Sequence, residues 1–110
     1  MSGRLGKVYY RDHLAGNLEE TAGGYRFTYD PAYLSDPRMP DISLTLPKQK
    51  EPFEAPVLFP FFFGLLAEGV QKEIQCRFLK IDEADDFGRL IRTASQDTIG
   101  AVTVHEEVAG

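Results

Sequence analysis

The segment YRFTYD, residues 25–30, alternates aromatic and polar side chains and decides the predicted fold class. In a strand, Tyr25, Phe27 and Tyr29 share one face of the sheet, because successive side chains point to opposite faces. Residues 5–10 are also apolar and β-prone, and turn-forming residues lie between and beside these segments. These turn-forming residues are Asp12, Gly16, Asn17 and the run Ala22-Gly23-Gly24. We therefore predict an antiparallel meander over the first thirty residues.

Following this segment, the sequence predicts a short helix, a strand and a loop. The pairs Asp30-Pro31 and Asp36-Pro37 delimit a short helical piece. Apolar residues then alternate with serine and threonine and predict a half-buried strand that ends at Pro47. Its apolar residues are Ile42, Leu44 and Leu46. Residues 47–56 are rich in proline and charge, so we expect an exposed, mobile loop there.

The second half of the chain predicts helices followed by a strand. Pro60 suits the first turn of a helix that runs to Glu68 and ends at Gly69. An amphipathic helix follows, with apolar residues at spacings of four, four and three. These residues are Val70, Ile74, Phe78 and Ile81. A third helix begins at Asp85 or Asp86. Its inner face contains Phe87, Leu90, Ile91 and Ala94. Residues 99–105 return to a strand.

This order of elements predicts one α+β domain over residues 1–110. We expect a small antiparallel sheet or partly closed barrel, with two to three helices packed on it.

The charge balance argues against a nucleic-acid-binding protein. The chain has 12 Lys and Arg against 17 Asp and Glu, a formal net charge of −5. Phosphate binding depends instead on clustered basic side chains. Residues 51–110 hold the acidic excess, with 5 basic and 11 acidic side chains. That half suits a basic partner, or it is simply a solvated acidic surface.

Cysteine content and hydropathy predict a cytoplasmic protein with no membrane partner. Cys76 is the single cysteine, so no internal disulfide forms and a reducing compartment fits. The first residues lack the apolar run of a signal peptide, and no apolar stretch approaches the ~20 residues that span a bilayer.

The residue inventory predicts that the chain is not an enzyme and holds no cofactor or metal. His13 and His105 neighbour no nucleophile motif. The carboxylates between Asp82 and Asp86 lack the spacing of a calcium loop and are explained as helix caps. Neither glycine cluster, residues 3–6 or 22–25, matches a phosphate-binding loop.

The aromatic run over residues 58–66 is the remaining candidate site. On a helix, Phe61, Phe62 and Phe63 point about 100° apart, so they cannot all face one core. Phe63 points toward Ala67 and Val70, the side expected to meet solvent. Two interpretations stay open: Phe63 is an interface anchor, or it packs under the 47–56 loop.

Four blocks of the sequence resemble the N-terminal subdomain that precedes the kinase core in HipA-type serine/threonine kinase toxins. These blocks are YDPAYL at 29–34, ISLTLP at 42–47, PFFFGLLAEG at 60–69 and QDTIGAV at 96–102. In order and spacing they cover most of residues 5–107.

The resemblance implies a function. A HipA-type protein continues into its kinase where this chain stops, so the chain is similar to the HipS family of stand-alone antitoxins. In these three-part HipBST systems, HipT is a shortened kinase and HipB binds DNA. The resemblance implies binding to a HipT-type kinase in trans and its inhibition, within a complex that includes a HipB-type DNA-binding protein. The alternatives are a non-inhibitory scaffold subunit of such a complex, or a fragment of a full-length HipA-type kinase.

The third block departs from the family pattern P-F-F-E-N-L-L-P-E-G. Phe63-Gly64 replaces a polar pair, and Ala67 replaces a proline. An aromatic side chain thus stands where the attached subdomain has a polar one, as expected if the surface must bind a separate partner. The predicted partner-binding residues are Phe59, Phe63, Gly64, Ala67 and Glu68. Phe63 is expected to act as a wedge near the Gly-rich loop of the kinase.

Overall fold

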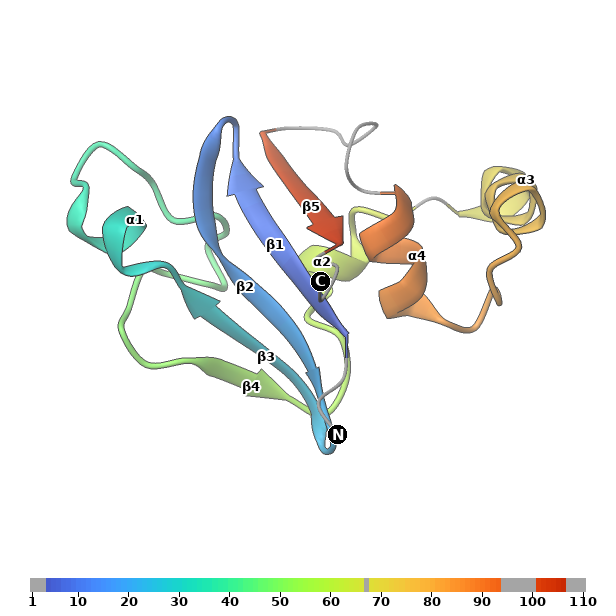
Figure 1. Cartoon of the computed structure of the whole chain (residues 1–110), viewed down its shortest axis with the longest axis horizontal. Helices are drawn as coiled ribbons and strands as arrows, with labels where there is room; N and C mark the ends of the chain where they lie inside the picture. Colours follow the sequence, from blue (N-terminus) through green and yellow to red (C-terminus); the bar gives the residue numbers. More distant parts are fainter. Residues whose placement is uncertain (1–3, 67, 94–100, 107–110) are drawn as a thin grey trace.

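A computed structural model describes residues 4–66, 68–93 and 101–106 of the chain, and these form five strands and four helices (Figure 1). The strands are β1 (Leu5–Tyr10), β2 (His13–Thr21), β3 (Gly24–Tyr29), β4 (Phe53–Ala55) and β5 (Val102–Glu106). The helices are α1 (Pro31–Ser35), α2 (Pro60–Phe63), α3 (Gly69–Leu79) and α4 (Asp86–Thr93). The predicted α+β class is confirmed. Ala94 and Ile99, which we assigned to the last helix and the last strand, lie outside the described residues.

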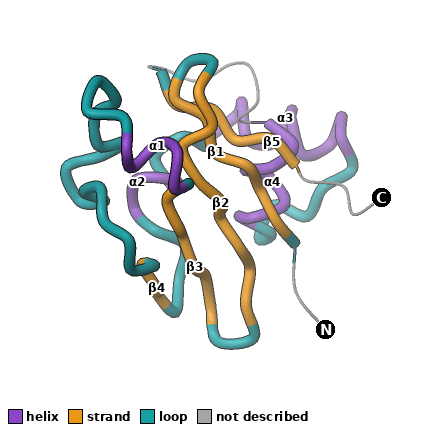
Figure 2. The backbone as a smooth tube through the Cα atoms, turned by 60° about the vertical axis from the view of Figure 1, so that its left-hand side comes forward, coloured by secondary structure: helices purple, strands orange, loops and turns teal. Residues whose placement is uncertain are grey.

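The five strands form one open antiparallel sheet in the order β4-β3-β2-β1-β5. The first three strands are the predicted meander and run side by side in Figure 2. β5 pairs with the outer edge of β1, so the last described strand lies beside the first.

Gly16 and Asn17 do not form a turn, contrary to the prediction, because both lie within β2. The turn is made by Arg11 and Asp12. Val8 pairs with Gly16 but Tyr9 pairs with Leu14, so the β1–β2 register shifts between these pairs. A Cβ at Gly16 would lie 2.3 Å from the Thr28 carbonyl oxygen. Glycine is required here by the close approach of β3, which a turn signal in the sequence does not distinguish.

The core is built on the aromatic face of β3. Phe27 is fully buried and Tyr29 is 3% exposed, which confirms the predicted alternation. The Phe27 ring lies 5.6 Å from the ring of Phe62 on α2, measured between centroids. The Tyr25 ring lies 5.7 Å from that of Phe87 on α4. α2 and α4 therefore cover the same face of the sheet.

The predicted strand over residues 42–46 is wrong: this segment is a tight turn with a bridge between Ser43 and Leu46. Ile42 and Leu46 are buried, whereas Leu44 at the tip is 97% exposed. The Ser43 hydroxyl accepts a hydrogen bond from the Thr45 N–H at 3.2 Å. This local hydrogen bond stabilises the turn in place of an extended strand.

The predicted loop over residues 47–56 is wrong at its end, because residues 53–55 form the edge strand β4. Phe53 is directly opposite Phe27 in the register. Its ring lies 6.5 Å from the Phe27 ring. Packing of this one aromatic residue outweighs the proline-rich composition around it.

The helix predicted from Pro60 to Glu68 is shorter in the structure. α2 is a single turn that ends at Phe63, with Gly64 as C-cap. The next two N–H groups, of Leu65 and Leu66, bond three residues back at 3.1 Å, so the chain tightens into turns. Gly69 adopts a φ of +63° and begins α3 instead of ending α2.

α3 confirms the predicted second helix but not the expected packing of its apolar face. Cys76 is the buried residue of α3. Its apolar residues are exposed by 69% at Val70, 60% at Ile74 and 85% at Phe78. In Figure 1 α3 lies at one end of the molecule, away from the sheet.

α4 confirms the predicted third helix. Phe87, Leu90 and Ile91 are buried, as expected of its inner face. Across the described residues, no helix has the length and apolar character needed to cross a membrane.

Candidate partner-binding site

The candidate site is built on α2, where neighbouring phenylalanines point in opposite directions. Phe62 is fully buried, whereas Phe63 is 45% exposed. Pro60 at the first helical position pre-orders the turn. The backbone N–H groups of Phe63 and Gly64 then bond the carbonyls of Phe59 and Pro60, at 3.0 and 2.9 Å. The buried Phe62 ring and this closed turn fix the direction in which Phe63 projects.

Phe63 lines a cavity of about 180 Å³ between α2, α3 and α4. The other lining residues are Leu66, Glu68, Gly69, Lys72 and Arg89. None of these lining residues comes from the 47–56 segment. The sequence left two interpretations of Phe63 open, an interface anchor or a residue packed under the 47–56 loop. The described contacts favour the first, because Phe63 is half-exposed and lines a cavity with residues from other segments.

Arg89 is a buried cation in the wall of this cavity. Its side chain is 3% exposed, and Nη1 lies 3.3 Å from the Asp86 Oδ1 atom. The sequence pattern of α4 does not reveal this burial, because Arg89 lies off the predicted inner face. α4 is buried around its middle, since it packs against the sheet on one side and near α2 on the other.

The predicted site residues take different positions. Phe63, Gly64 and Glu68 are exposed, and the cavity brings Phe63 and Glu68 together. Phe59 is 8% exposed and packs its ring 6.2 Å from the Phe62 ring. Phe59 therefore offers a partner little surface and supports α2 from within the core. Ala67 lies outside the described residues.

Sequence reasoning missed Lys72 and Arg89. Their proximity to Phe63 depends on how three short helices meet. The apolar spacing used to predict these helices carries no information about a basic residue outside the apolar face.

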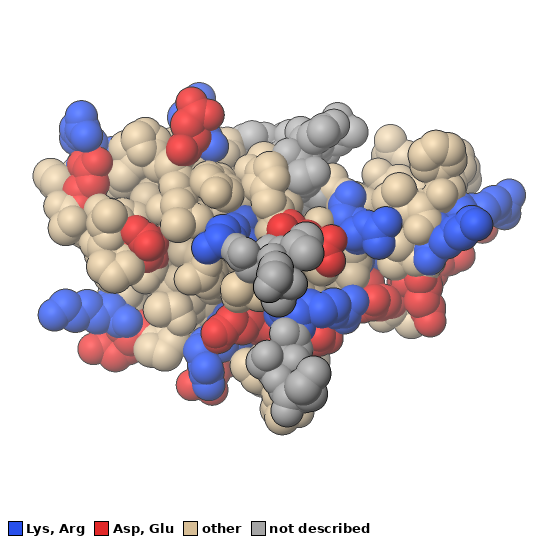
Figure 3. All heavy atoms as spheres, viewed as in Figure 1, with Lys and Arg blue, Asp and Glu red and all other residues tan. Residues whose placement is uncertain are grey.

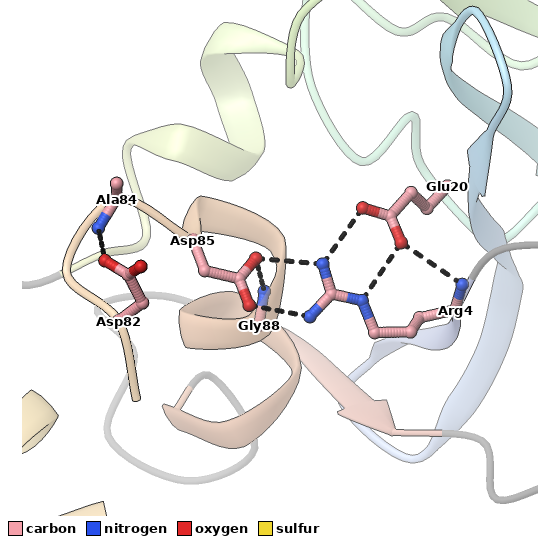
Figure 4. A network of polar contacts seen from close by, with 6 residues as sticks. All are labelled: Arg4, Glu20, Asp82, Ala84, Asp85 and Gly88. Atoms are coloured by element: carbon pink, nitrogen blue, oxygen red, sulfur yellow. Dashed lines mark hydrogen bonds and ion pairs between the residues drawn. The ribbon is translucent and has the colours of Figure 1, made fainter. Parts of the chain in front are cut away.

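An ion-pair network positions α4 and hence Arg89. Figure 4 shows the Arg4 guanidinium between the carboxylates of Glu20 on β2 and Asp85 just before α4. Arg4 donates to both Asp85 oxygens at 2.8 Å and to Glu20 at 2.9 and 3.0 Å. Asp85 also accepts from the Gly88 N–H at 3.1 Å. This contact confirms the predicted capping role for the acidic cluster.

The hydrogen bonds of this network shift the pKa values of Arg4, Glu20 and Asp85. The hydrogen bonds from Arg4 hold the pKa values of Asp85 and Glu20 below their usual range, against an opposing effect of burial. The same hydrogen bonds raise the pKa of Arg4. The network therefore stays charged at neutral pH and ties the first strand to the last helix.

The rest of the described surface offers weaker candidates. A hollow of about 530 Å³ lies beside the β2–β3 turn. Its charged residues Arg26 and Glu54 pair with each other at 3.8 Å.

Lys, Arg, Asp and Glu are interspersed over the face in Figure 3. Within the described ranges, no three His, Cys, Asp or Glu side chains are grouped so that they could hold a metal ion.

Comparison with known proteins agrees with this fold. The sequence profile described as HipA N-terminal domain matches residues 6–105. The chain belongs to the HipA N-terminal domain family. The solved N-terminal domain of HipA toxin superposes with a TM-score of 0.72 at 31% identity, over 97% of this chain and 95% of that one. The four sequence blocks therefore identified the family correctly.

Two relatives of this HipA N-terminal domain differ in length. An uncharacterized protein of Haemophilus influenzae is 36% identical over 104 residues, which cover 94% of this chain and 93% of that protein. The Sinorhizobium fredii protein named "Putative kinase Y4mE" is 32% identical over 108 residues, which cover 97% of this chain. The match spans only 26% of Y4mE. The domain thus occurs both as most of a small protein and as one part of a larger one.

Proposed function

We propose that this HipA N-terminal domain is an antitoxin that binds a separate HipT-type serine/threonine kinase and inhibits it. The observation that carries the proposal is Phe63, which is 45% exposed beside the fully buried Phe62. An exposed aromatic ring on a rigid turn is typical of an interface anchor. The Haemophilus influenzae relative supports a separate domain, because the match covers 93% of that protein.

The inhibitory mechanism follows from the rigidity of α2. Phe63 inserts beside the Gly-rich loop of the kinase and displaces it, so that the groups that position the ATP phosphates cannot assemble. The acidic excess of residues 51–110 steers the domain toward a basic nucleotide cleft. A HipB-type DNA-binding protein completes the complex, and the domain itself contacts no nucleic acid.

The test is Phe63→Ala in cells that co-express the kinase. We expect loss of protection against the kinase, because the wedge is removed while the buried Phe62 still holds α2. Val57→Ala is the matched control, since Val57 is also an exposed apolar residue, at 67%. Full protection by Phe63→Ala would refute the wedge.

A second assay separates inhibition from scaffolding. Autophosphorylation of the purified kinase is measured with and without this domain, and with no DNA-binding protein present. We expect the wild-type domain to suppress autophosphorylation and Phe63→Ala to restore it. Unchanged autophosphorylation in a complex that forms would show a scaffold subunit instead.

A further inference from the structure

α3 carries an apolar stripe that no described element covers. Val70, Ile74 and Phe78 follow one another at four-residue spacing, and their side chains are exposed by 69%, 60% and 85%. At about 100° per residue, Val70 and Phe78 lie about 40° to either side of Ile74 around the helix axis. Cys76, the buried residue of α3, lies about 160° from Ile74. The stripe therefore points away from the body of the domain, and α3 itself lies at one end of the molecule (Figure 1).

The borders of this stripe are balanced in charge. Arg77 and Glu73 lie about 60° and 100° from Ile74 on one side of the helix. Among the residues that the structure describes, neither of these two forms an ion pair. The other border carries the neutral side chains of Gln71 and Gln75, at the same angles on the opposite side. A border that holds both signs of charge, or none, can meet a copy of itself without repulsion.

We infer that α3 binds α3 of a second copy of this chain, antiparallel and about a two-fold axis beside Ile74. Each residue then lies level with the residue that is equally far from Ile74 on the other side. The small Val70 comes opposite the large Phe78 of the second copy, and the reverse holds at the other end. The stripe is thus complementary to itself in shape, since each bulky ring meets a small side chain.

The same arrangement brings opposite charges together. A two-fold axis perpendicular to both helices places like borders side by side, so Arg77 of one copy meets the border with Glu73 of the other. These two residues come within about 3 Å of the same level, at 1.5 Å rise per residue. Glu68 and Lys80 flank α3, are exposed, and are equally far from Ile74. They too come to the same level with opposite charge.

The size of the stripe sets the expected affinity. Three side chains per copy cover roughly a few hundred Å², less than the ~800 Å² per partner of a standard interface. We expect a weak dimer with a dissociation constant on the order of 100 μM, so the chain is monomeric at a few micromolar. Lys72, which lines the cavity beside Phe63, lies about 160° from Ile74. Pairing through the stripe therefore does not use that cavity, and the inference does not depend on the proposed function.

Sedimentation equilibrium of the full chain, from about 5 μM to about 1 mM, measures the pairing. We expect the mean mass to rise from the monomer value of 12.3 kDa toward twice that value. Phe78→Gln should weaken pairing at least about tenfold, because the most exposed ring of the stripe is lost from both copies. Leu44→Gln is the matched control, since Leu44 is 97% exposed at the turn over residues 42–46. A chain that stays monomeric, or equal weakening by both changes, would overturn the inference.

A mixing experiment tests the contact between the charged borders. Glu73→Arg and Arg77→Glu each leave one sign of charge on the border, so each variant alone should pair about threefold more weakly than wild type. Mixed in equal amounts, the two variants should pair with nearly wild-type affinity, because each then carries the charge that the other lacks. A mixture that pairs no better than either variant alone would contradict the antiparallel arrangement.

Disulfide formation tests the position of the two-fold axis. A residue beside that axis faces itself in the second copy, and a disulfide requires Cα atoms within about 7 Å. We expect Ile74→Cys to form a covalent dimer under mild oxidation. Val70→Cys should form little, because it lies about 12 Å along the axis from the same residue of the second copy. The native Cys76 is buried and is common to both variants. Equally fast linkage of both variants would indicate parallel or random contact, and the inference would fail.

Discussion

β3 and α3 both carry apolar residues at regular spacing, yet these residues are buried in β3 and exposed in α3. Phe27 and Tyr29 of β3 are 0% and 3% exposed, whereas Ile74 and Phe78 of α3 are 60% and 85% exposed. A periodic pattern determines which residues share a face of an element. Whether another element covers that face depends on the rest of the fold.

The difference arises from the neighbours of each element. The aromatic face of β3 is covered by Phe62 of α2 and by Phe87 of α4. α3 begins at Gly69, at a φ of +63°, and ends before Lys80, at a φ of +58°. These left-handed residues turn the chain at both ends of α3, and it meets the body through Cys76. α3 should therefore contribute little to the stability of the domain.

The largest expected effect is that of Phe62→Ala, compared with its neighbour Phe63→Ala. Phe62 is fully buried against Phe27 and Phe59, so its loss leaves a cavity and should cost about 3–5 kcal/mol of unfolding free energy. Phe63 is 45% exposed, so its loss should cost about 1 kcal/mol or less. Urea denaturation measures the unfolding free energy of each variant. Similar losses would mean that Phe63 belongs to the core.

A smaller effect is expected for Tyr29→Phe. The Tyr29 hydroxyl accepts from the Ile42 N–H at 3.1 Å and donates to the Leu46 carbonyl. The change leaves both buried groups without this partner and should cost about 1–3 kcal/mol. Tyr9→Phe serves as control, because Tyr9 on β1 is only partly buried, whereas Tyr29 is buried. We expect the control to unfold at the same urea concentration as wild type.

The Arg4 network should make stability depend on pH by a still smaller amount. Arg4 lowers the folded-state pKa values of Asp85 and Glu20. Their contribution is thus present above the unfolded-state values of about 4 and is lost as pH falls through the lower folded-state values. The side chains are 30–40% exposed, so solvent screening limits the effect to about 1 kcal/mol.

Arg4→Met tests this dependence. Unfolding free energies are compared at pH 7 and pH 3, and the deficit of the variant should be smaller at the lower pH, where Asp85 and Glu20 begin to be protonated. A deficit that is equal at both pH values would assign the role of Arg4 to packing on the Phe87 ring, 5.3 Å from its guanidinium carbon.

The sequence predicted much of the fold and part of the site. The meander, α1, α3 and α4 follow from local periodicity and capping, which act over a few residues. Gly16, the turn at residues 42–46 and β4 were missed, because each depends on a contact with β3 or with Tyr29 that is distant in sequence. Likewise, helix geometry could predict the exposure of Phe63. It could not predict that Arg89 lies beside Phe63, because that depends on how the helices meet.

The smallest expected effect is on α3, and it tests the opening comparison most directly. Ile74→Gln replaces a 60% exposed side chain with a good helix former, so the unfolding free energy should change by no more than about 0.5 kcal/mol. Ile91→Gln makes the same change in α4 at a residue only 4% exposed, and should cost several kcal/mol because a polar group is buried without its solvation. Urea denaturation of both variants is the measurement. A large loss of unfolding free energy in Ile74→Gln would mean that the apolar face of α3 is packed in solution. The apolar faces of β3 and α3 would then both be buried.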